Sequence, residues 1–581
     1  MNDGLNQFGQ DAHFTDRILH ALIGRWTSGI SPYALALAGT DWLLHLTASP
    51  AKRHELADNI RNNSLRYSAW LAAMSGGGAP PPIIKPLPGD ERFTATDWQV
   101  WPYYPVQQAF LLTEQWWRHA TTDVRGMTPH HEDVVSFTAR QLLDMVSPSN
   151  LPWMNPEVLN RTRKEGGLNL VRGFLNWQED TMRQLAGQPP VGVEDFRVGH
   201  ELAVTPGSVI HRNPLMELIQ YAPTTGTVYR EPVLICPSWI MKYYILDLRP
   251  ENSLVRYLVE RGHTVYMISW KNPGHGERHL GMEDYLRLGP LEAVDQVAAI
   301  HPEIPIHSVG YCLGGTLLSI AAATMARGGD QRLGSMTLLA AQVDFSEPGE
   351  LDLFIDESQV TFLEDVMWAD GYLDARKMAG AFQLLRSQDL FWSRLLHDYL
   401  LGERSPVFDL MAWNADTTRM PARMHSDYLR SLFLRNDLVE GRYEVDGQPV
   451  HLGDIKAPVF AVGTQKDHVA PWQSTYKVHR LLRTDVTFLL TSGGHNAGIV
   501  SPADHPRRTH QIIARKATDP WVPAERFAET APVEAGSWWP VWERWLRDRS
   551  TSRRQPPPAI GVPGREPAEL APAPGTYVLE S

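Results

Sequence analysis

The second half of the chain holds a cysteine, an aspartate and a histidine at positions where they could act together. Cys312 lies in a Gly-x-Cys-x-Gly motif, between the apolar run "IPIHSV" and the small-residue stretch "GGTLLSIAAA". A nucleophile on such a strand-to-helix turn is presented at the end of a sheet, and the following helix N-terminus stabilises a thiolate. Asp467 and His495 each follow a later apolar run, in "PVFAVGTQKDHVAP" and "VTFLLTSGGHNAG". The order nucleophile, acid, histidine predicts a Cys-His-Asp triad for nucleophilic catalysis.

The same segments offer alternatives to this assignment. Gly-x-Cys-x-Gly alone would also fit a buried cysteine whose neighbouring glycines serve packing. His468 could replace His495, but it adjoins Asp467, and neighbouring side chains of an extended segment point apart. Cys236, in "VLICPSWI", is expected to be a buried strand residue. His495 alone could be a solvated loop histidine, so the interpretation depends on all three residues occurring in order.

An oxyanion formed during acyl transfer needs backbone donors beside the nucleophile. The N–H of Leu313, directly after Cys312, is one expected donor. The second should come from the loop after an earlier strand, which "VLICPSWIMKYY" supplies, and we expect the N–H of Trp239. We see no metal-ligand spacing, so we predict no metal site.

Composition limits the class of protein. The chain has 581 residues, 43% of them hydrophobic, a net charge of −12 and two cysteines. Two cysteines are too few for a disulfide framework. The negative net charge excludes an overall basic field that would attract nucleic acid. The polar start "MNDGLNQFGQDAHFTDR" is unlike a signal peptide, and no apolar run approaches the length of a membrane span. We therefore expect a cytoplasmic protein without a transmembrane segment. The many tryptophans are expected in the core and at interfaces, or along an apolar substrate channel.

The pattern of apolar runs predicts the elements that must position these residues. Short β-rich runs, several separated by helical stretches, begin near residue 196 and predict a doubly wound, mostly parallel α/β sheet. We place the catalytic domain at 196–548, with a helical insertion at about 346–445 as a candidate lid. Before it we expect a helical segment (1–74), a Gly/Pro-rich linker (75–97) and a helical domain (98–195). The Pro-rich residues 549–581 suggest an extended tail.

A cysteine nucleophile favours one kind of acyl chemistry. Transfer from a thioester to Cys312 gives another thioester, so the step is close to isoenergetic and the acyl group stays activated for a second nucleophile. That property suits an acyltransferase that uses a coenzyme A thioester and condenses the acyl group with an alcohol. Some hydrolases of this fold also use cysteine, so a hydrolase remains the alternative.

The sequence resembles the poly(3-hydroxyalkanoate) synthases, closest to the class I type, from about Asp41 to Trp545. The resemblance is carried by "GYCLGGTLL", "KYYILDLRPENSLVRYLVERGHTVYMISWKNP", "TPGSVIHRNPLMELIQYAP", "FSEPGELDLFIDESQV", "WNADTTRMPARMHSDYLR" and "GSWWPVW", and further by "DERFTATDW" and "SPSNLPWMNPEVL". The family usually has Asn before Lys-Tyr-Tyr, where this chain has Met241. It often has Pro-Pro ahead, where this chain has Ser238 in place of the second proline. These changes put the substrate range in doubt, but not the triad.

The resemblance implies an α/β-hydrolase-like fold and an (R)-3-hydroxyacyl-CoA substrate. The product would be a polyester, with release of coenzyme A and no cofactor beyond it. It implies that Cys312 is acylated and that His495 is its base. Asp467 would orient His495 or help to deprotonate the attacking 3-hydroxyl. It further implies a homodimer at the surface of polymer granules, and a helical insertion that gates the site. It does not identify the residues that bind coenzyme A. A hydrolase on the same fold, a polyester depolymerase or a thioesterase, remains the alternative. A granule-associated interaction protein without catalysis is a third reading, which an intact triad opposes.

Overall fold

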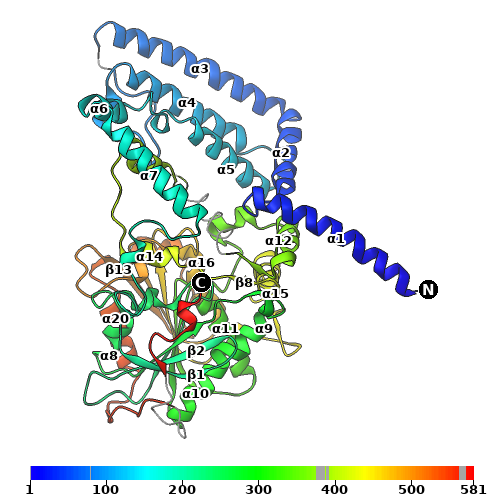
Figure 1. Cartoon of the computed structure of the whole chain (residues 1–581), viewed down its shortest axis with the longest axis vertical. Coiled ribbons are helices and arrows are strands. Elements are labelled where there is room, and N and C mark those ends of the chain that lie inside the picture. Colours follow the sequence, from blue (N-terminus) through cyan, green and yellow to red (C-terminus); the bar gives the residue numbers. More distant parts are fainter. Residues whose placement is uncertain (1, 79, 375–386, 388–390, 562–570) are drawn as a thin grey trace. The chain divides into compact units, whose positions relative to one another are not determined.

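The computed structural model describes residues 2–78, 80–374, 387, 391–561 and 571–581, with only the backbone for 2–13. By contact, the chain forms two compact units. The first consists of Met1–Gly29, Gly192–Ala379 and Val407–Ser581, and the second of Ile30–Val191 and Gly380–Pro406. The boundaries of these units differ from those suggested by composition. One reason is that α1 (Asn2–Trp26) packs against α12 (Glu357–Asp370) and so belongs to the first unit (Figure 1).

The second unit is a set of packed helices, which confirms the predicted helical character of this region. Its helices are α2 (Pro32–Thr47), α3 (Pro50–Ser75), α4 (Tyr103–Thr121), α5 (Pro129–Met145), α6 (Pro156–Lys164), α7 (Leu168–Leu185) and η9 (Leu395–Leu400). Four of them begin with proline, whose fixed φ suits the first helical position. A small core forms around Trp98 and Phe110, and the guanidinium of Arg92 is buried beside it among carboxylates.

The first unit is built on one large sheet. Its strands are β1 (Gly207–Arg212), β2 (Met216–Tyr221), β3 (Val233–Cys236), β4 (Val265–Trp270), β5 (Ile306–Tyr311), β6 (Leu333–Leu339), β11 (Val459–Thr464), β12 (Val486–Thr491), β13 (Thr509–Arg515), β14 (Glu534–Ala535) and β15 (Ala571–Pro572). Across the described residues their order is β14-β13-β12-β11-β6-β5-β3-β4-β2-β1-β15. The pairs from β12 to β4 are parallel and the flanking pairs are antiparallel. The mostly parallel sheet predicted from the sequence is confirmed.

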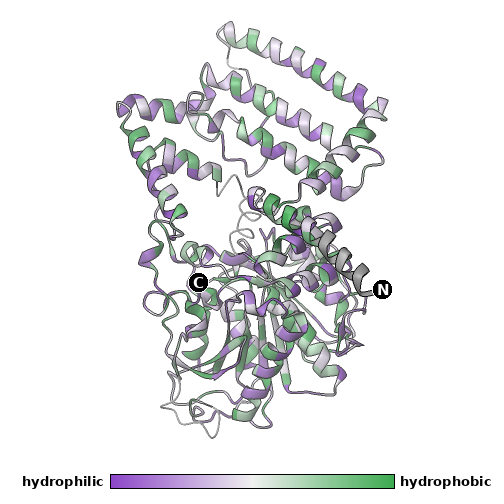
Figure 2. Ribbon diagram, turned by 45° about the vertical axis from the view of Figure 1, so that its right-hand side comes forward, coloured by the Kyte–Doolittle hydropathy of each residue, from purple (hydrophilic) through white to green (hydrophobic). Residues whose placement is uncertain are grey.

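Side chains of the central strands alternate between two cores, as the two-residue period of a strand requires. In β3, Leu234 and Cys236 join one core and Val233 and Ile235 the other. Helices α10 (Glu292–Ile300) and α11 (Leu313–Arg327) contribute to the first core. Helices α8 (Leu254–Val259) and α20 (Trp539–Arg547) contribute to the second. Helices therefore cover both faces, and the central strands are hydrophobic where they lie between them (Figure 2).

The insertion between β6 and β11 carries the predicted helical cap. It contains α12, α14 (Asp409–Ala415) and α15 (Ala422–Tyr428). It also has short antiparallel ribbons that the sequence did not predict, one pairing β7 (Tyr372–Leu373) with β8 (Met420–Pro421) and one pairing β9 (Glu444–Val445) with β10 (Gln448–Pro449). Residues 375–386 and 388–390 of the cap prediction lie outside the described residues, and residues 380–406 count with the second unit.

The last residues pack on the first unit, where the sequence suggested an extended tail. Strand β15 pairs with β1 at the edge of the sheet, a place that tolerates proline. Val578 is buried, and the ammonium of Lys242 donates to the carbonyl of Glu580 at 2.6 Å. Residues 562–570 of the tail prediction lie outside the described residues. Among the helices that the structure describes, none has the length and apolar character needed to cross a bilayer.

Candidate active site

Cys312 lies on a strained turn between β5 and α11. Its backbone has φ +52° and ψ −127°, a conformation that costs energy for any residue with a Cβ. The neighbouring glycines allow the turn to close. A Cβ on Gly310 would lie 2.4 Å from Cα of Gly315, and one on Gly314 would lie 2.2 Å from the carbonyl oxygen of Cys236. The Gly-x-Cys-x-Gly spacing is therefore a steric requirement of this turn.

Asp467 and His495 meet at the carboxyl ends of β11 and β12. Nδ1 of His495 lies 2.8 Å from Oδ2 of Asp467, and both side chains are buried. The hydroxyl of Thr464 donates to the same carboxylate at 2.8 Å, and the N–H groups of Val469 and Ala470 donate to its other oxygen at 3.0 and 2.8 Å. A carboxylate with all these hydrogen bonds fixes the orientation of the His495 ring. The imidazole can therefore present its other nitrogen to Cys312.

The electrostatics of this pair oppose the effect of burial. Burial alone would raise the pKa of Asp467, but the charge of His495 and hydrogen bonds from His495, Ala470 and Thr464 hold it below its ordinary value. Burial alone would lower the pKa of His495, but the charges of Asp467 and Cys312, and hydrogen bonds with both, raise it well above 6.5. Both partners of His495 therefore favour its protonated form.

The two expected oxyanion donors come from different segments of the first unit. Leu313 is the first residue of α11, and the first N–H groups of a helix have no partner within it. Trp239 follows β3 in a segment held by the cap, since the hydroxyl of Thr418 donates to its carbonyl oxygen at 2.7 Å. Ser238 is buried, and Met241 pairs with Thr417 in an isolated β-bridge. The assignment of both donors stays a prediction.

The structure also places the alternatives that the sequence left open. Cys236 is buried in β3, where burial raises the pKa of its thiol far above the usual range. The carbonyl oxygen of His468 accepts a hydrogen bond from the N–H of Glu350 at 3.0 Å, at the start of the cap insertion. His495, by contrast, makes the hydrogen bond with Asp467.

Sequence reasoning missed Tyr428, at the end of cap helix α15. Its ring packs edge-on against Trp239 with centroids 6.1 Å apart, and against Phe433 at 5.2 Å. Burial, and then the charge of Cys312, raise the pKa of its phenol well above the usual range. The sequence carries no signal that a tyrosine of the cap insertion lies near Trp239 and Cys312, because only the fold brings the cap against them.

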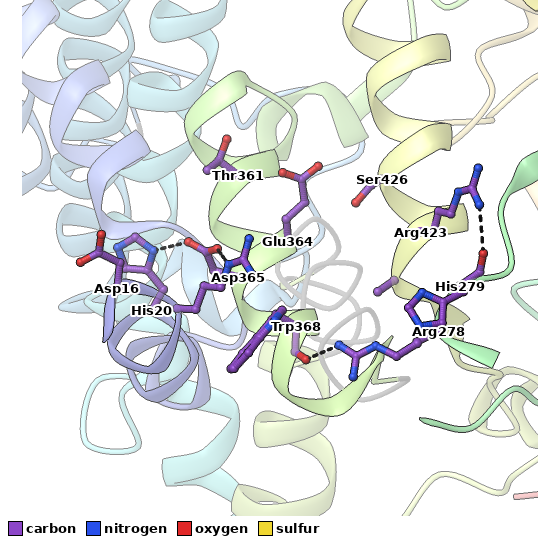
Figure 3. Close-up of a pocket in the computed structure, with 12 residues that line it drawn as sticks. Asp16, His20, Arg278, His279, Thr361, Glu364, Asp365, Trp368, Arg423 and Ser426 are labelled. Carbon is purple, nitrogen blue, oxygen red and sulfur yellow. Dashed lines mark hydrogen bonds and ion pairs between the residues drawn. The ribbon is translucent and has the colours of Figure 1, made fainter. Parts of the chain in front are cut away.

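A cavity of about 610 Å³ lies between α1, α12 and α15, and its lining does not include Cys312, Asp467 or His495 (Figure 3). On one side His20 pairs with Asp365 at 2.7 Å. On the other, Arg278 donates to the carbonyl oxygen of Trp368 at 2.6 Å. Cationic and anionic side chains line it together, so its charge selects no class of ligand.

Comparison with known proteins gives consistent matches along the chain. The family model "Poly-beta-hydroxybutyrate polymerase (PhaC) N-terminus" matches residues 89–258, and "Poly-beta-hydroxybutyrate polymerase N terminal" matches residues 10–52. The model "alpha/beta hydrolase fold" matches residues 231–502, which include Cys312, Asp467 and His495.

Full-length relatives agree with these matches. The poly(3-hydroxyalkanoate) polymerase of Methylorubrum extorquens is 42% identical over 525 residues, covering 88% of this chain and 84% of the relative. The poly(3-hydroxyalkanoate) polymerase subunit PhaC of Cupriavidus necator is 34% identical over 551 residues, covering 94% and 91%. The corresponding subunit of Rhizobium meliloti is 38% identical over 518 residues, covering 88% and 83%. The chain therefore belongs to the poly(3-hydroxyalkanoate) polymerase family, and its first unit has the α/β-hydrolase fold.

Proposed function

We propose that this enzyme condenses (R)-3-hydroxyacyl-CoA into poly(3-hydroxyalkanoate) and releases coenzyme A, through an acyl thioester on Cys312. The observation that carries the proposal is the position of Cys312 on a strained turn, within reach of the hydrogen-bonded pair His495 and Asp467. The family membership supplies the substrate class, because the relatives named above are poly(3-hydroxyalkanoate) polymerases.

The first half-reaction loads the enzyme. His495 takes the thiol proton of Cys312, and the thiolate attacks the thioester carbonyl of the substrate. The bond to the coenzyme A sulfur breaks, and His495 returns the proton to that leaving sulfur. The raised pKa of His495 supports this step, because the imidazolium is stabilised while the proton is held.

The second half-reaction extends the chain. The 3-hydroxyl of another hydroxyacyl unit attacks the thioester on Cys312, and His495, oriented by Asp467, removes its proton. An ester bond forms, the bond to the Cys312 sulfur breaks, and the proton returns to the thiol. In both halves the oxyanion is held by the N–H of Leu313 and, from the opposite loop, that of Trp239.

The remaining features of the proposal are taken from the family resemblance. Coenzyme A is part of the substrate and a product, and the steps above use no metal or other cofactor. We propose a cytoplasmic homodimer that stays at the surface of the polymer granule. A hydrolase on the same fold, a depolymerase or thioesterase, is the alternative, which the polymerase relatives make weaker.

The test is incubation of the purified protein with (R)-3-hydroxybutyryl-CoA, with thiol release and product mass followed together. Thiol release with insoluble polyester supports the polymerase. Thiol release with free 3-hydroxybutyrate alone would replace it by the hydrolase. C312A should abolish release, whereas C236A, which removes the buried thiol in β3, should retain it. Near-normal release by C312A would overturn the assignment of the nucleophile.

A further inference from the structure

The residues next to the nucleophile and the base in the chain also contact each other. Tyr311 immediately precedes Cys312, and Asn496 immediately follows His495. The hydroxyl of Tyr311 donates to Oδ1 of Asn496 at 2.6 Å. The Tyr311 ring also lies against the imidazole of His495, with centroids 5.9 Å apart and planes tilted by 35°. The two residues at the end of β5 and the turn after it thus contact the two residues that begin the segment carrying His495.

The two ends of this contact lie on different elements. Tyr311 is the last residue of β5, is 2% exposed and belongs to the core that α8 and α20 cover. His495 and Asn496 open the short helix α18 (His495–Ile499), directly after Gly493 and Gly494. Gly493 has φ +114°, the left-handed region that favours glycine. The far end of α18 is held by Trp538 and Trp539, whose indole N–H groups donate to the carbonyl oxygens of Gly498 and Ile499 at 3.1 and 3.0 Å. The hydrogen bond to Tyr311 therefore holds the other end of α18, which carries His495, to a residue of the sheet.

The protonation of Tyr311 suits its part as the donor. Burial raises the pKa of the phenol well above its ordinary value, and the charges of Cys312 and Asp467 act in the same direction. The hydroxyl therefore keeps its proton throughout the working pH range. Asn496 offers a neutral acceptor, which adds no charge beside His495.

We propose that Tyr311 and Asn496 form a latch that positions His495 against Cys312. Tyr311 and Asn496 act through their neighbours and are positioning residues. Without the hydrogen bond between Tyr311 and Asn496, the imidazole stays hydrogen-bonded to Asp467. The first turn of α18, which carries His495, can then move relative to Cys312. Displacements near 1 Å at a reacting centre cost up to about 100-fold in rate. The proposal rests on the proposed function for its catalytic consequence, but not for its geometry.

Y311F removes only the hydroxyl donor. N496L replaces the amide acceptor by an apolar side chain of similar size. Each should lower kcat for coenzyme A release about tenfold, with KM changed less than about twofold, since the latch acts on the chemical step. The double variant should be no worse than either single variant, because both break one contact. Y266F is the matched control. It removes a buried hydroxyl that lies 2.9 Å from Nε2 of His301, at the opposite ends of the strands from Cys312.

A second readout needs no acyl substrate. Alkylation of Cys312 by iodoacetamide, followed by mass spectrometry across pH, reports how well His495 supports the thiolate. In Y311F and N496L the pH profile should move to higher pH, while in Y266F only the melting temperature should fall. Unchanged profiles and unchanged kcat in both latch variants, or additive losses in the double variant, overturn the proposal. A wild-type protein that releases no coenzyme A would overturn the proposed function, and the alkylation profiles would still decide on the latch.

Discussion

Nδ1 of His495 lies 2.8 Å from Oδ2 of Asp467, on a carboxylate whose remaining partners come from the last residue of β11 and the turn after it. The N–H groups of Val469 and Ala470 and the hydroxyl of Thr464 fill the other acceptor positions. The carboxylate thus has its direction set by the sheet and by its own loop, and the imidazole takes its direction from the carboxylate. The orientation of the base relative to Cys312 follows from this chain of contacts.

Replacing this carboxylate by its amide tests that orientation. D467N should retain the fold, because the amide is nearly isosteric, but it removes the negative charge that raises the pKa of His495. We expect kcat to fall by about 10,000-fold, the loss that the same replacement causes in a Ser-His-Asp triad. Coenzyme A release gives the rate, and circular dichroism checks the fold. Normal turnover by a folded D467N would exclude Asp467 as the orienting acid.

The pH dependence of stability gives a separate test of His495. Its pKa in the folded protein lies well above 6.5, so folding strengthens proton binding at this site. The stabilisation is fully present below pH 6.5 and is lost as the pH rises through the folded value. The stability advantage of the wild type over H495Q should therefore shrink toward alkaline pH. Urea unfolding midpoints across pH measure it, and an advantage that grows with pH would contradict the assigned direction.

The central sheet could be predicted because its strands carry a strong local signal. Continuous apolar runs such as "HTVYMISW" and "DVTFLL" correspond to β4 and β12, which are buried on both faces. The flanking antiparallel strands gave a weaker signal. In β13 only two adjacent residues, His510 and Gln511, are buried, and β15 is a dipeptide that contains a proline. Their pairing depends on edges that the sheet provides only after it has formed.

The site could be predicted in part for a related reason. Gly310, Cys312 and Gly314 are close in sequence, and the turn that they form is a local requirement. Asp467 and His495 were found because each follows a strand of the same sheet. The contacts of Tyr428 could not be predicted, since they depend on how α15 of the cap packs against the loop after β3, and no local pattern sets that packing.

The glycine spacing of the nucleophile turn can be tested with one methyl group. G314A would place a Cβ 2.2 Å from the carbonyl oxygen of Cys236 and 2.5 Å from that of Pro237, and neither backbone atom can move without shifting β3. We expect a loss of about 1–3 kcal/mol in the free energy of unfolding, together with a large loss of turnover. G226A is the control, because its Cβ would meet no atom within 4 Å. Equal stability of the two variants would contradict the steric account of the motif.

The buried Lys242 supports a last prediction, about the end of the chain. Its side chain is 3% exposed, and its ammonium donates to the carbonyl oxygens of Glu580 at 2.6 Å and Tyr577 at 3.5 Å. Burial lowers the pKa of this lysine, and the charges of Asp416 and Glu580 oppose that effect only in part. K242M keeps the length of the side chain but removes the ammonium donor, and the carbonyl oxygen of Glu580 then keeps only the longer contact from Nδ2 of Asn272, at 3.4 Å.

We expect K242M to lose about 1.5–3 kcal/mol of stability, the usual contribution of a hydrogen bond that involves a charged group. The control is K516M, at a lysine that is 73% exposed and pairs with Asp485 on the surface, where a loss of less than about 1 kcal/mol is expected. Limited proteolysis shows whether residues 571–581 have been released in K242M. The carbonyl oxygen of Lys242 also accepts a hydrogen bond from Nε1 of Trp413. Release of the C-terminal residues should therefore loosen the segment that carries Trp239 and Lys242, and turnover should fall. Intact C-terminal residues and unchanged stability in K242M would show that this contact does not hold the end of the chain on the sheet.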